Sequence, residues 1–252
     1  MKELLSKVRP ASGFAHFTHI ALRLLLPVLA FILVRIDFGQ LALALVLISK
    51  WRMFAVRPRH WPAIVRANAV DMIAGASFVL AMDYASAQLW QLVWAVMFAI
   101  WLTYIKPRST SFYVGLQAII AQSLGLSVAF LLMTEAHTGW LVLATWLICY
   151  VSARHFLTAF DEPLARPMAE GWGFFAAAFI LIMSRWMLFY GVISQAAIAL
   201  SICAYGFAAM YYLHEIGKLT PAIKRQFVFV MSVVILFIII LADWGDKIID
   251  KY

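Results

Sequence analysis

The side chains best suited to chemistry lie where two apolar stretches end. His155, Asp161 and Glu162 lie at the end of one stretch, and His214 and Glu215 lie at the end of another. Imidazole and carboxylate groups at one surface can bind a metal ion or move protons. No HxxxH or HxxE spacing joins them, so a metal site would need ligands from separate helices. We therefore predict no metal and no cofactor, and keep the five as candidates for chemistry at the cytoplasmic face.

A second polar group lies inside the apolar segments nearest the N-terminus. His19 and Arg23 are four residues apart, and Asn68 and Asp71 are three apart, so each pair shares one face of a helix. A charge at the centre of a membrane helix costs about 2.5–3.5 kcal/mol and needs a partner. One hypothesis is an Arg23–Asp71 ion pair in a polar pocket that includes His19 and Asn68. In the alternative, Arg23 extends to the interface and Asp71 caps its own helix.

Residues 111–133 form an apolar segment with two amides, Gln117 and Gln122. The same segment carries small residues, including Gly125, that permit close helix approach. The amides favour hydrogen bonds between helices, and the alternative is a solute path. We include both with His19, Arg23, Asn68 and Asp71 as the candidate substrate-binding set.

Small residues also recur after the polar connector in the second half of the chain. Gly171 and Gly173 flank Trp172, and three alanines follow at residues 176–178. Small residues let the backbones of two membrane helices approach closely. The pattern predicts a close-packed contact between this helix and a neighbour.

The composition indicates that the chain lies in lipid rather than in water. The chain has 252 residues, of which 65% are hydrophobic and 13% charged, whereas soluble domains have about 25% charged residues. The apolar runs are continuous rather than alternating with period two, which favours helices over a membrane barrel. We predict an all-α, polytopic bundle of transmembrane helices.

The apolar runs predict about nine spans of roughly 20 residues. Lys50 and Arg52 interrupt the second span and Asp71 the third, so the count ranges from seven to nine. We treat the chain as one integral membrane domain with a cytoplasmic connector at 161–171. The predicted helices cover residues 14–34, 38–56, 67–82, 87–105, 111–133, 140–160, 172–190, 193–213 and 227–242.

Basic residues predict the orientation. Most of the 20 lysines and arginines fall in alternate loops. By the positive-inside rule, these loops and the N-terminus lie in the cytoplasm. With nine spans, the C-terminus would then lie outside. On the outer side, Arg185 is expected to pair with Asp83 or Asp243. The net charge of +8 indicates contact with anionic lipid rather than nucleic acid. A plasma or inner membrane fits this pattern.

No motif specifies an activity. The chain lacks a Walker A loop, a GxGxxG, an HExxH and a GxSxG sequence, so we do not predict an enzyme. Helix number, short loops and scattered interior polar groups favour a carrier or channel for a small solute. One alternative is a non-catalytic subunit or scaffold that binds lipid or a membrane protein partner. Another is a lipid-modifying enzyme with its chemistry at the cytoplasmic surface.

Overall fold

A computed structural model of the chain describes residues 13–51, 55, 57–133, 137–183, 189–190 and 193–241, except for the side chains of 13–20, 189, 190 and 193. Nearly all of this part is helical, which confirms the all-α class. A short antiparallel ladder pairs β1 (Phe189–Tyr190) with β2 (Ile193–Ser194). The chain divides into two compact units. Unit 1 is Met1–Trp51 with Phe78–Pro107, and unit 2 is Arg52–Ser77 with Arg108–Tyr252.

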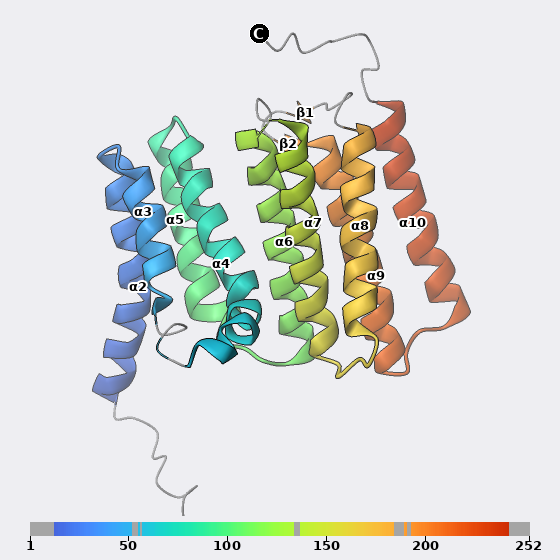
Figure 1. Cartoon of the computed structure of the whole chain (residues 1–252), viewed down its shortest axis with the longest axis horizontal. Coiled ribbons are helices and arrows are strands. Elements are labelled where there is room, and N and C mark those ends of the chain that lie inside the picture. The colour runs from blue at the N-terminus through green and yellow to red at the C-terminus, as the bar shows by residue number, and fades with distance from the viewer. Residues whose placement is uncertain are drawn as a thin grey trace, which may run out of the picture. The chain divides into compact units, whose positions relative to one another are not determined.

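Unit 1 contains two pairs of antiparallel helices, α2 (Gly13–Arg35) with α3 (Gly39–Ile48) and the end of α4 (Trp61–Tyr84) with α5 (Gln88–Ile100), each joined by a short turn (Figure 1). Asp37, with a positive φ of 60°, turns the chain between the first two helices. The π-helical turn η3 (Trp101–Ile105) follows α5.

An aromatic cluster and one buried amide hold unit 1 together. The ring of Phe78 stacks on that of Phe98, with centroids 5.5 Å apart, and lies 6.3 Å from that of Trp101. Gln91 accepts a hydrogen bond from Arg35 at 3.4 Å and donates one to the carbonyl of Ala85 at 2.9 Å. The amide therefore links α2 to the turn before α5.

Asp83, at the end of α4, is exposed. Arg185 is predicted to pair with Asp83 or with Asp243. Both Arg185 and Asp243 lie outside the described residues. That ion pair stays a prediction.

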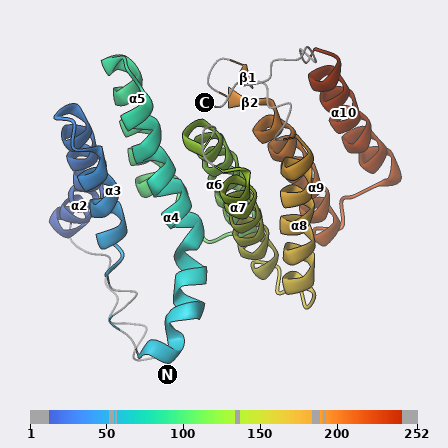
Figure 2. The same cartoon turned by 45° about the horizontal axis from the view of Figure 1, so that its top comes forward.

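Unit 2 contains the longest run of antiparallel helices. Figures 1 and 2 show α6 to α10 following one another up and down, as their short connections predict. The elements are η2 (Pro58–His60), the N-terminal part of α4, α6 (Ser111–Met133), α7 (Thr138–Thr158), α8 (Ala165–Met183), α9 (Gln195–Glu215) and α10 (Pro221–Ile240).

One end of unit 2 gathers the connections between α7 and α8 and between α9 and α10, together with η2 and the starts of α4 and α6 (Figure 1). We call it the basic end, because most of its charged side chains are cations. The described cations of these connections and helix ends are Arg57, Arg59, Arg66, Arg108, Arg154, Arg166, Lys218, Lys224 and Arg225.

Among the residues that the structure describes, six helices are long and apolar enough to cross a membrane. These are Pro58–Tyr84, Gln88–Ile105, Ser111–Met133, Thr138–Thr158, Gln195–Glu215 and Pro221–Ile240. By helix length and composition, the chain is an integral membrane protein. The predicted total of seven to nine spans and the orientation stay predictions.

The second predicted span, residues 38–56, is much shorter in the structure. Helix α3 ends at Ile48 after 10 residues, about 15 Å, or half of a bilayer core of roughly 30 Å. The hydroxyl of Ser49 donates to the carbonyl of Val46 at 2.6 Å. The polar run that begins at Ser49 therefore stops the helix.

The predicted connector at 161–171 is mostly helical. Helix α8 begins at Ala165, seven residues before the predicted start at Trp172. Glu162 accepts a hydrogen bond from the backbone N–H of Leu164 at 3.1 Å, just before the first turn. Pro167 lies within that turn, where a helix tolerates proline because the early N–H groups have no helical acceptor. The polar composition of this turn made it resemble a loop.

Helices α7 and α8 pack closely through small residues. A Cβ added to Gly173 of α8 would lie 3.1 Å from the backbone oxygen of Trp146 on α7. Ala176 and Ile180 are buried in a cluster with Cys149. The predicted close-packed contact is confirmed at Gly173, whereas Gly171 meets no neighbour within 4 Å.

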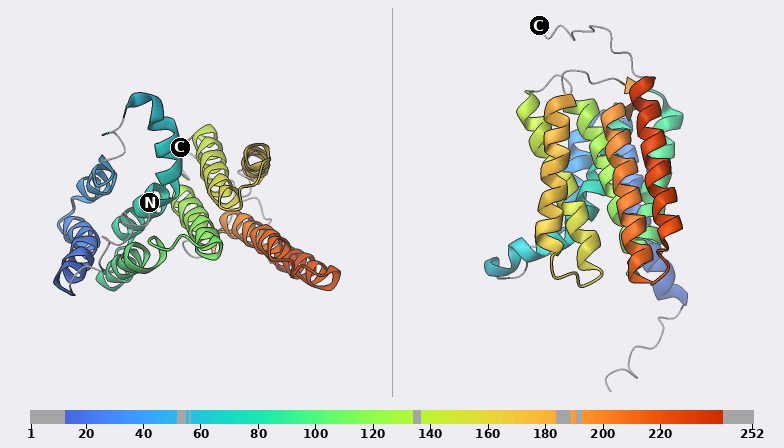
Figure 3. Two further views of the ribbon diagram at one scale, coloured as in Figure 1. Left: turned by 90° about the horizontal axis from the view of Figure 1, so that it is seen from below. Right: turned by 90° about the vertical axis from the view of Figure 1, so that its right-hand side faces the viewer.

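Helix α10 packs against α9, and none of its described residues is buried. The end-on view in Figure 3 shows α10 continuing outward from α9, away from α7 and α8. The interior of unit 2 is therefore formed mainly by α6 to α9.

Candidate functional site

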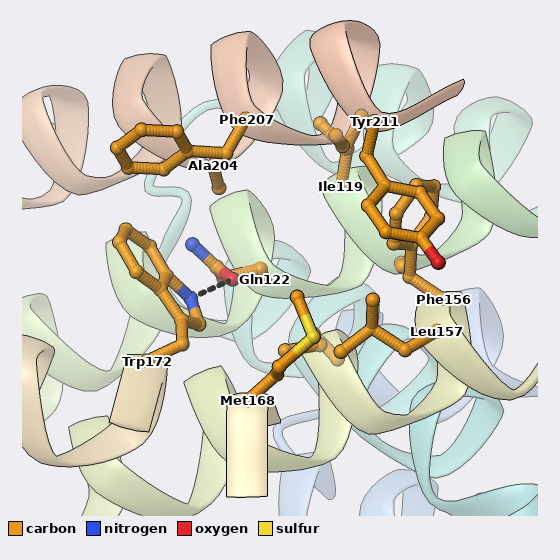
Figure 4. A pocket seen from close by; sticks show the side chains of 13 residues that line it. Ile119, Gln122, Phe156, Leu157, Met168, Trp172, Ala204, Phe207 and Tyr211 are labelled. Atoms are coloured by element: carbon orange, nitrogen blue, oxygen red, sulfur yellow. Dashed lines mark hydrogen bonds between the residues drawn. The ribbon is translucent and has the colours of Figure 1, made fainter. Parts of the chain in front are cut away.

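A pocket of about 170 Å³ lies among α6, α7, α8 and α9. Figure 4 shows its side chains converging from these helices. All the residues belong to unit 2. They are Ala118, Ile119 and Gln122 of α6, Ser152, Ala153, Phe156 and Leu157 of α7, Met168 and Trp172 of α8, and Ala204, Phe207, Ala208 and Tyr211 of α9.

The pocket exists because small and aromatic residues alternate along α9. Ala204 and Ala208 are one turn apart and leave space, while Phe207 and Tyr211, also one turn apart, form walls. The ring of Trp172 meets that of Phe207 edge-on at 5.8 Å. Of these lining residues, the sequence prediction included Gln122 alone, and the paired i, i+4 alanines and aromatics were the available signal for the others.

Gln122 is the principal polar group of the wall and is 3% exposed. Its Oε1 accepts a hydrogen bond from the indole Nε1 of Trp172 at 3.0 Å, and its Nε2 donates to the carbonyl of Leu200 at 3.4 Å. One amide therefore joins α6 to α8 and α9. The hydrogen bonds orient the Trp172 ring that borders the pocket in Figure 4.

Ser152 also lines the pocket, and it is 1% exposed. Its Oγ has no hydrogen-bond partner among the described residues. A buried polar group left unpaired costs about 1–3 kcal/mol. Ser152 is therefore the unpaired polar group that a polar atom of a ligand in the pocket would satisfy.

The pocket borders the side of unit 2 where α8 and α9 diverge. These helices are consecutive in sequence but touch at few positions. Met168 and Phe207, one from each helix, are 43% and 51% exposed. Because α9 is apolar and long enough to span a membrane, these exposed side chains would face lipid in a bilayer.

A hydrogen bond ties the pocket wall to the connector between α7 and α8. The hydroxyl of Tyr211 donates to Oε2 of Glu162 at 2.5 Å. The ring of Tyr211 packs edge-on against Phe156 and Phe160, with centroids 5.7 and 5.3 Å away. The bond from Tyr211, followed by that from the Leu164 backbone, lowers the pKa of Glu162 below its usual range.

Stability should fall slightly in acid because of this carboxylate. A lowered folded-state pKa adds stability above the ordinary value of 4.5, and this contribution is lost as the pH falls through the lower pKa of the folded chain. Denaturant unfolding at pH 7 and pH 3 should show a larger loss for the wild-type chain than for Glu162→Gln. Tyr211→Phe, which removes the main donor, should also reduce the pH dependence. Equal losses in all three chains would contradict the prediction.

The five candidates for surface chemistry do not form one centre. Nε2 of His155 lies 3.3 Å from Oε1 of Gln117, Glu162 bonds to Tyr211, and the exposed Asp161 forms a left-handed turn with φ of 52°. His214 and Glu215 are exposed at the end of α9. In the described part of the chain, no group of three or more His, Cys, Asp or Glu side chains is placed to hold a metal ion.

The structure places the predicted substrate-binding set only in part. Gln122 lines the pocket, but Gln117 does not and instead donates to the carbonyl of Arg108 at 2.9 Å. Asn68 donates to the carbonyl of Ile64 in its own helix at 2.9 Å. Arg23 belongs to unit 1 and Asp71 to unit 2, so their ion pair stays a prediction. The side chain of His19 lies outside the described part.

No protein-family model, curated protein or solved structure matches the chain. The pocket is therefore the basis on which a function can be proposed.

Proposed function

We propose that this integral membrane protein binds an apolar molecule that carries one hydrogen-bonding group, in the pocket among α6 to α9. The observation that supports this most directly is the Ser152 hydroxyl, buried in a mainly apolar wall without a partner among the described residues. A ligand with a hydroxyl or carbonyl group would satisfy Ser152 and place its apolar part against the aromatic walls. Ligand sites commonly combine an apolar lining with a few such polar groups.

The size of the pocket defines how much of the ligand it encloses. An apolar cavity of about 150 Å³ is large enough for benzene, so the 170 Å³ observed here accommodates one ring or a short length of chain. The remainder would extend past Met168 and Phe207 into the bilayer. This geometry favours a molecule drawn from the lipid phase.

The pocket supports a lipid-binding membrane protein better than a carrier for a hydrophilic solute. A polar solute would lose its hydration and find few polar groups in the lining. Of these, Gln122 bonds to Trp172 and Leu200, and Tyr211 bonds to Glu162. Burying a polar group without hydrogen bonds is unfavourable. Among the functions expected from sequence, the non-catalytic subunit that binds lipid is therefore the one we propose.

Photolabelling with two matched probes tests the proposal. One probe is a long-chain fatty alcohol bearing a diazirine and a clickable alkyne, and the other is the corresponding alkane. With the wild-type chain in nanodiscs, both should label the pocket, at Met168, Trp172 and Phe207, and the alcohol should label more strongly. Ser152→Ala should reduce this preference about two- to tenfold, since one hydrogen bond contributes about 0.5–1.5 kcal/mol, and leave alkane labelling unchanged.

Thr145 provides a matched control for the loss of a hydroxyl. It lies on the same helix, is 0% exposed, and its Oγ1 also has no partner among the described residues, but it does not line the pocket. Thr145→Ala should leave the preference for the alcohol intact. Labelling spread evenly over the lipid-facing helices, or an equal effect of both variants, would contradict the proposal.

A further inference from the structure

A second pocket, of about 380 Å³, lies at the basic end of unit 2. It lies on the other side of α7 from the first pocket. The α7 residues that line it are 154, 155, 158 and 159, and their mean direction lies roughly 160° around the helix axis from that of the α7 residues lining the first pocket. Its lining residues are Ala63, Arg66 and Ala67 of α4, Ser109 and Val114 near the start of α6, and Arg154, His155, Thr158 and Ala159 of α7 and its end.

The lining of this pocket is cationic. Arg66 and Arg154 approach it from two helices, His155 adds an imidazole, and the described lining contains no carboxylate. Ser109 and Thr158 contribute hydroxyl groups, of which that of Thr158 donates to the carbonyl of Arg154 at 2.6 Å. Two guanidinium groups without an acid in the same wall favour an anion.

Arg154 carries an unused donor. Its Nε is buried and has no hydrogen-bond partner among the described residues. A guanidinium offers parallel N–H groups in a planar fork that matches two oxygens of a phosphate or carboxylate. An oxyanion in the pocket would give Nε the acceptor that it lacks.

The side-chain amide of Gln117 holds His155 at the wall. Gln117 donates through Nε2 to the carbonyl of Arg108 at 2.9 Å, which leaves its Oε1 to accept from Nε2 of His155 at 3.3 Å. This network assigns the proton to Nε2 of the imidazole. Two connected hydrogen bonds therefore fix the side chain next to Arg154.

We propose that this pocket binds a phosphate group through Arg66 and Arg154. Arg154 lies four residues before the end of α7 at Thr158, about 6 Å along the helix axis, which is the depth of lipid headgroups when α7 spans a bilayer. The same chemistry would also accept a free phosphate ester. The inference is independent of the first pocket, because the two sets of lining residues do not overlap.

Native mass spectrometry of the full chain in detergent tests this site. Phosphatidylglycerol is titrated, with diacylglycerol as the phosphate-free control, and glycerol phosphate and inorganic phosphate are added as soluble competitors. The wild-type chain should bind phosphatidylglycerol in preference to diacylglycerol. Arg154→Gln and Arg66→Gln should each weaken that binding about tenfold, as expected for loss of charge-assisted hydrogen bonds.

Arg225→Gln is the matched control, because Arg225 is exposed at the same end and does not line the pocket. It should change the affinity by less than about twofold. Displacement of the lipid by millimolar glycerol phosphate or inorganic phosphate would identify a soluble phosphate as a ligand, and resistance to both would identify the lipid headgroup. Equal affinities for all three variants would overturn the proposal. If Arg154→Gln does not fold, the exposed Arg66 supplies the decisive variant.

Discussion

The Gly173→Leu variant is expected to unfold more readily than the wild-type chain, by about 1–3 kcal/mol, the usual cost of adding side-chain volume to a packed interior. A Cβ at this position would lie 3.1 Å from the backbone oxygen of Trp146 and from the Cβ of Tyr150. Neither atom can move without shifting α7. The parallel, stacked rings of Trp146 and Tyr150, 5.5 Å apart, further restrict rearrangement.

The matched control is Gly171→Leu, two residues earlier on the same helix. Nothing lies within 4 Å of a Cβ at Gly171, and leucine favours a helix over glycine by up to about 1 kcal/mol. Unfolding in mixed micelles of increasing denaturing detergent should therefore show Gly173→Leu destabilised and Gly171→Leu unchanged or stabilised. Similar midpoints for the two variants would mean that α7 and α8 are not packed as described.

The Ala204→Trp variant is expected to abolish labelling of the α6–α9 pocket by the photoactivatable alcohol, with a loss of about tenfold or more. Ala204 lines the pocket opposite Trp172. A tryptophan side chain has a volume comparable with the 170 Å³ available, so it would occupy the ligand's place. Ligand sites are usually pre-formed cavities, so filling this one with a side chain should prevent the alcohol from binding.

Ala178→Trp is the control for adding an indole to a membrane helix. Ala178 is exposed on α8 and does not line the pocket, so its replacement should leave labelling at Met168 and Phe207 unchanged. Detergent unfolding of both variants separates occlusion of the pocket from loss of the fold. A stable Ala204→Trp chain labelled at the same residues as the wild type would exclude this pocket as the binding site.

The positions of most helices could be predicted because lipid requires continuous apolar runs with internally satisfied backbones. The expected segment at 111–133 coincides with α6, and that at 14–34 lies within one residue of α2. Local polarity misled the prediction in two places. The polar residues at 161–171 resemble a loop, although α8 starts at Ala165. In the run at 38–56, the α-helix ends at Ile48 after ten residues.

Tertiary structure decided the site, as the two amides of α6 show. Sequence placed Gln117 and Gln122 on one helix and favoured helix–helix hydrogen bonds for both. The structure directs Gln122 to Trp172 and Leu200 beside the pocket, and Gln117 to His155 and the Arg108 carbonyl. Periodicity shows which residues share a face of a helix, but it does not show which neighbour that face meets.

The sequence by itself determined the all-α membrane class, the approximate helix positions and the close-packed contact at Gly173. Only the tertiary structure showed that Ser152 is left without a partner among the described residues and that α8 and α9 diverge beside it. The physical reason is that lipid tails are as apolar as leucine, so hydropathy does not distinguish a side that faces lipid from one that faces another helix. A cavity depends on how four helices pack, and that arrangement is not encoded in any one segment.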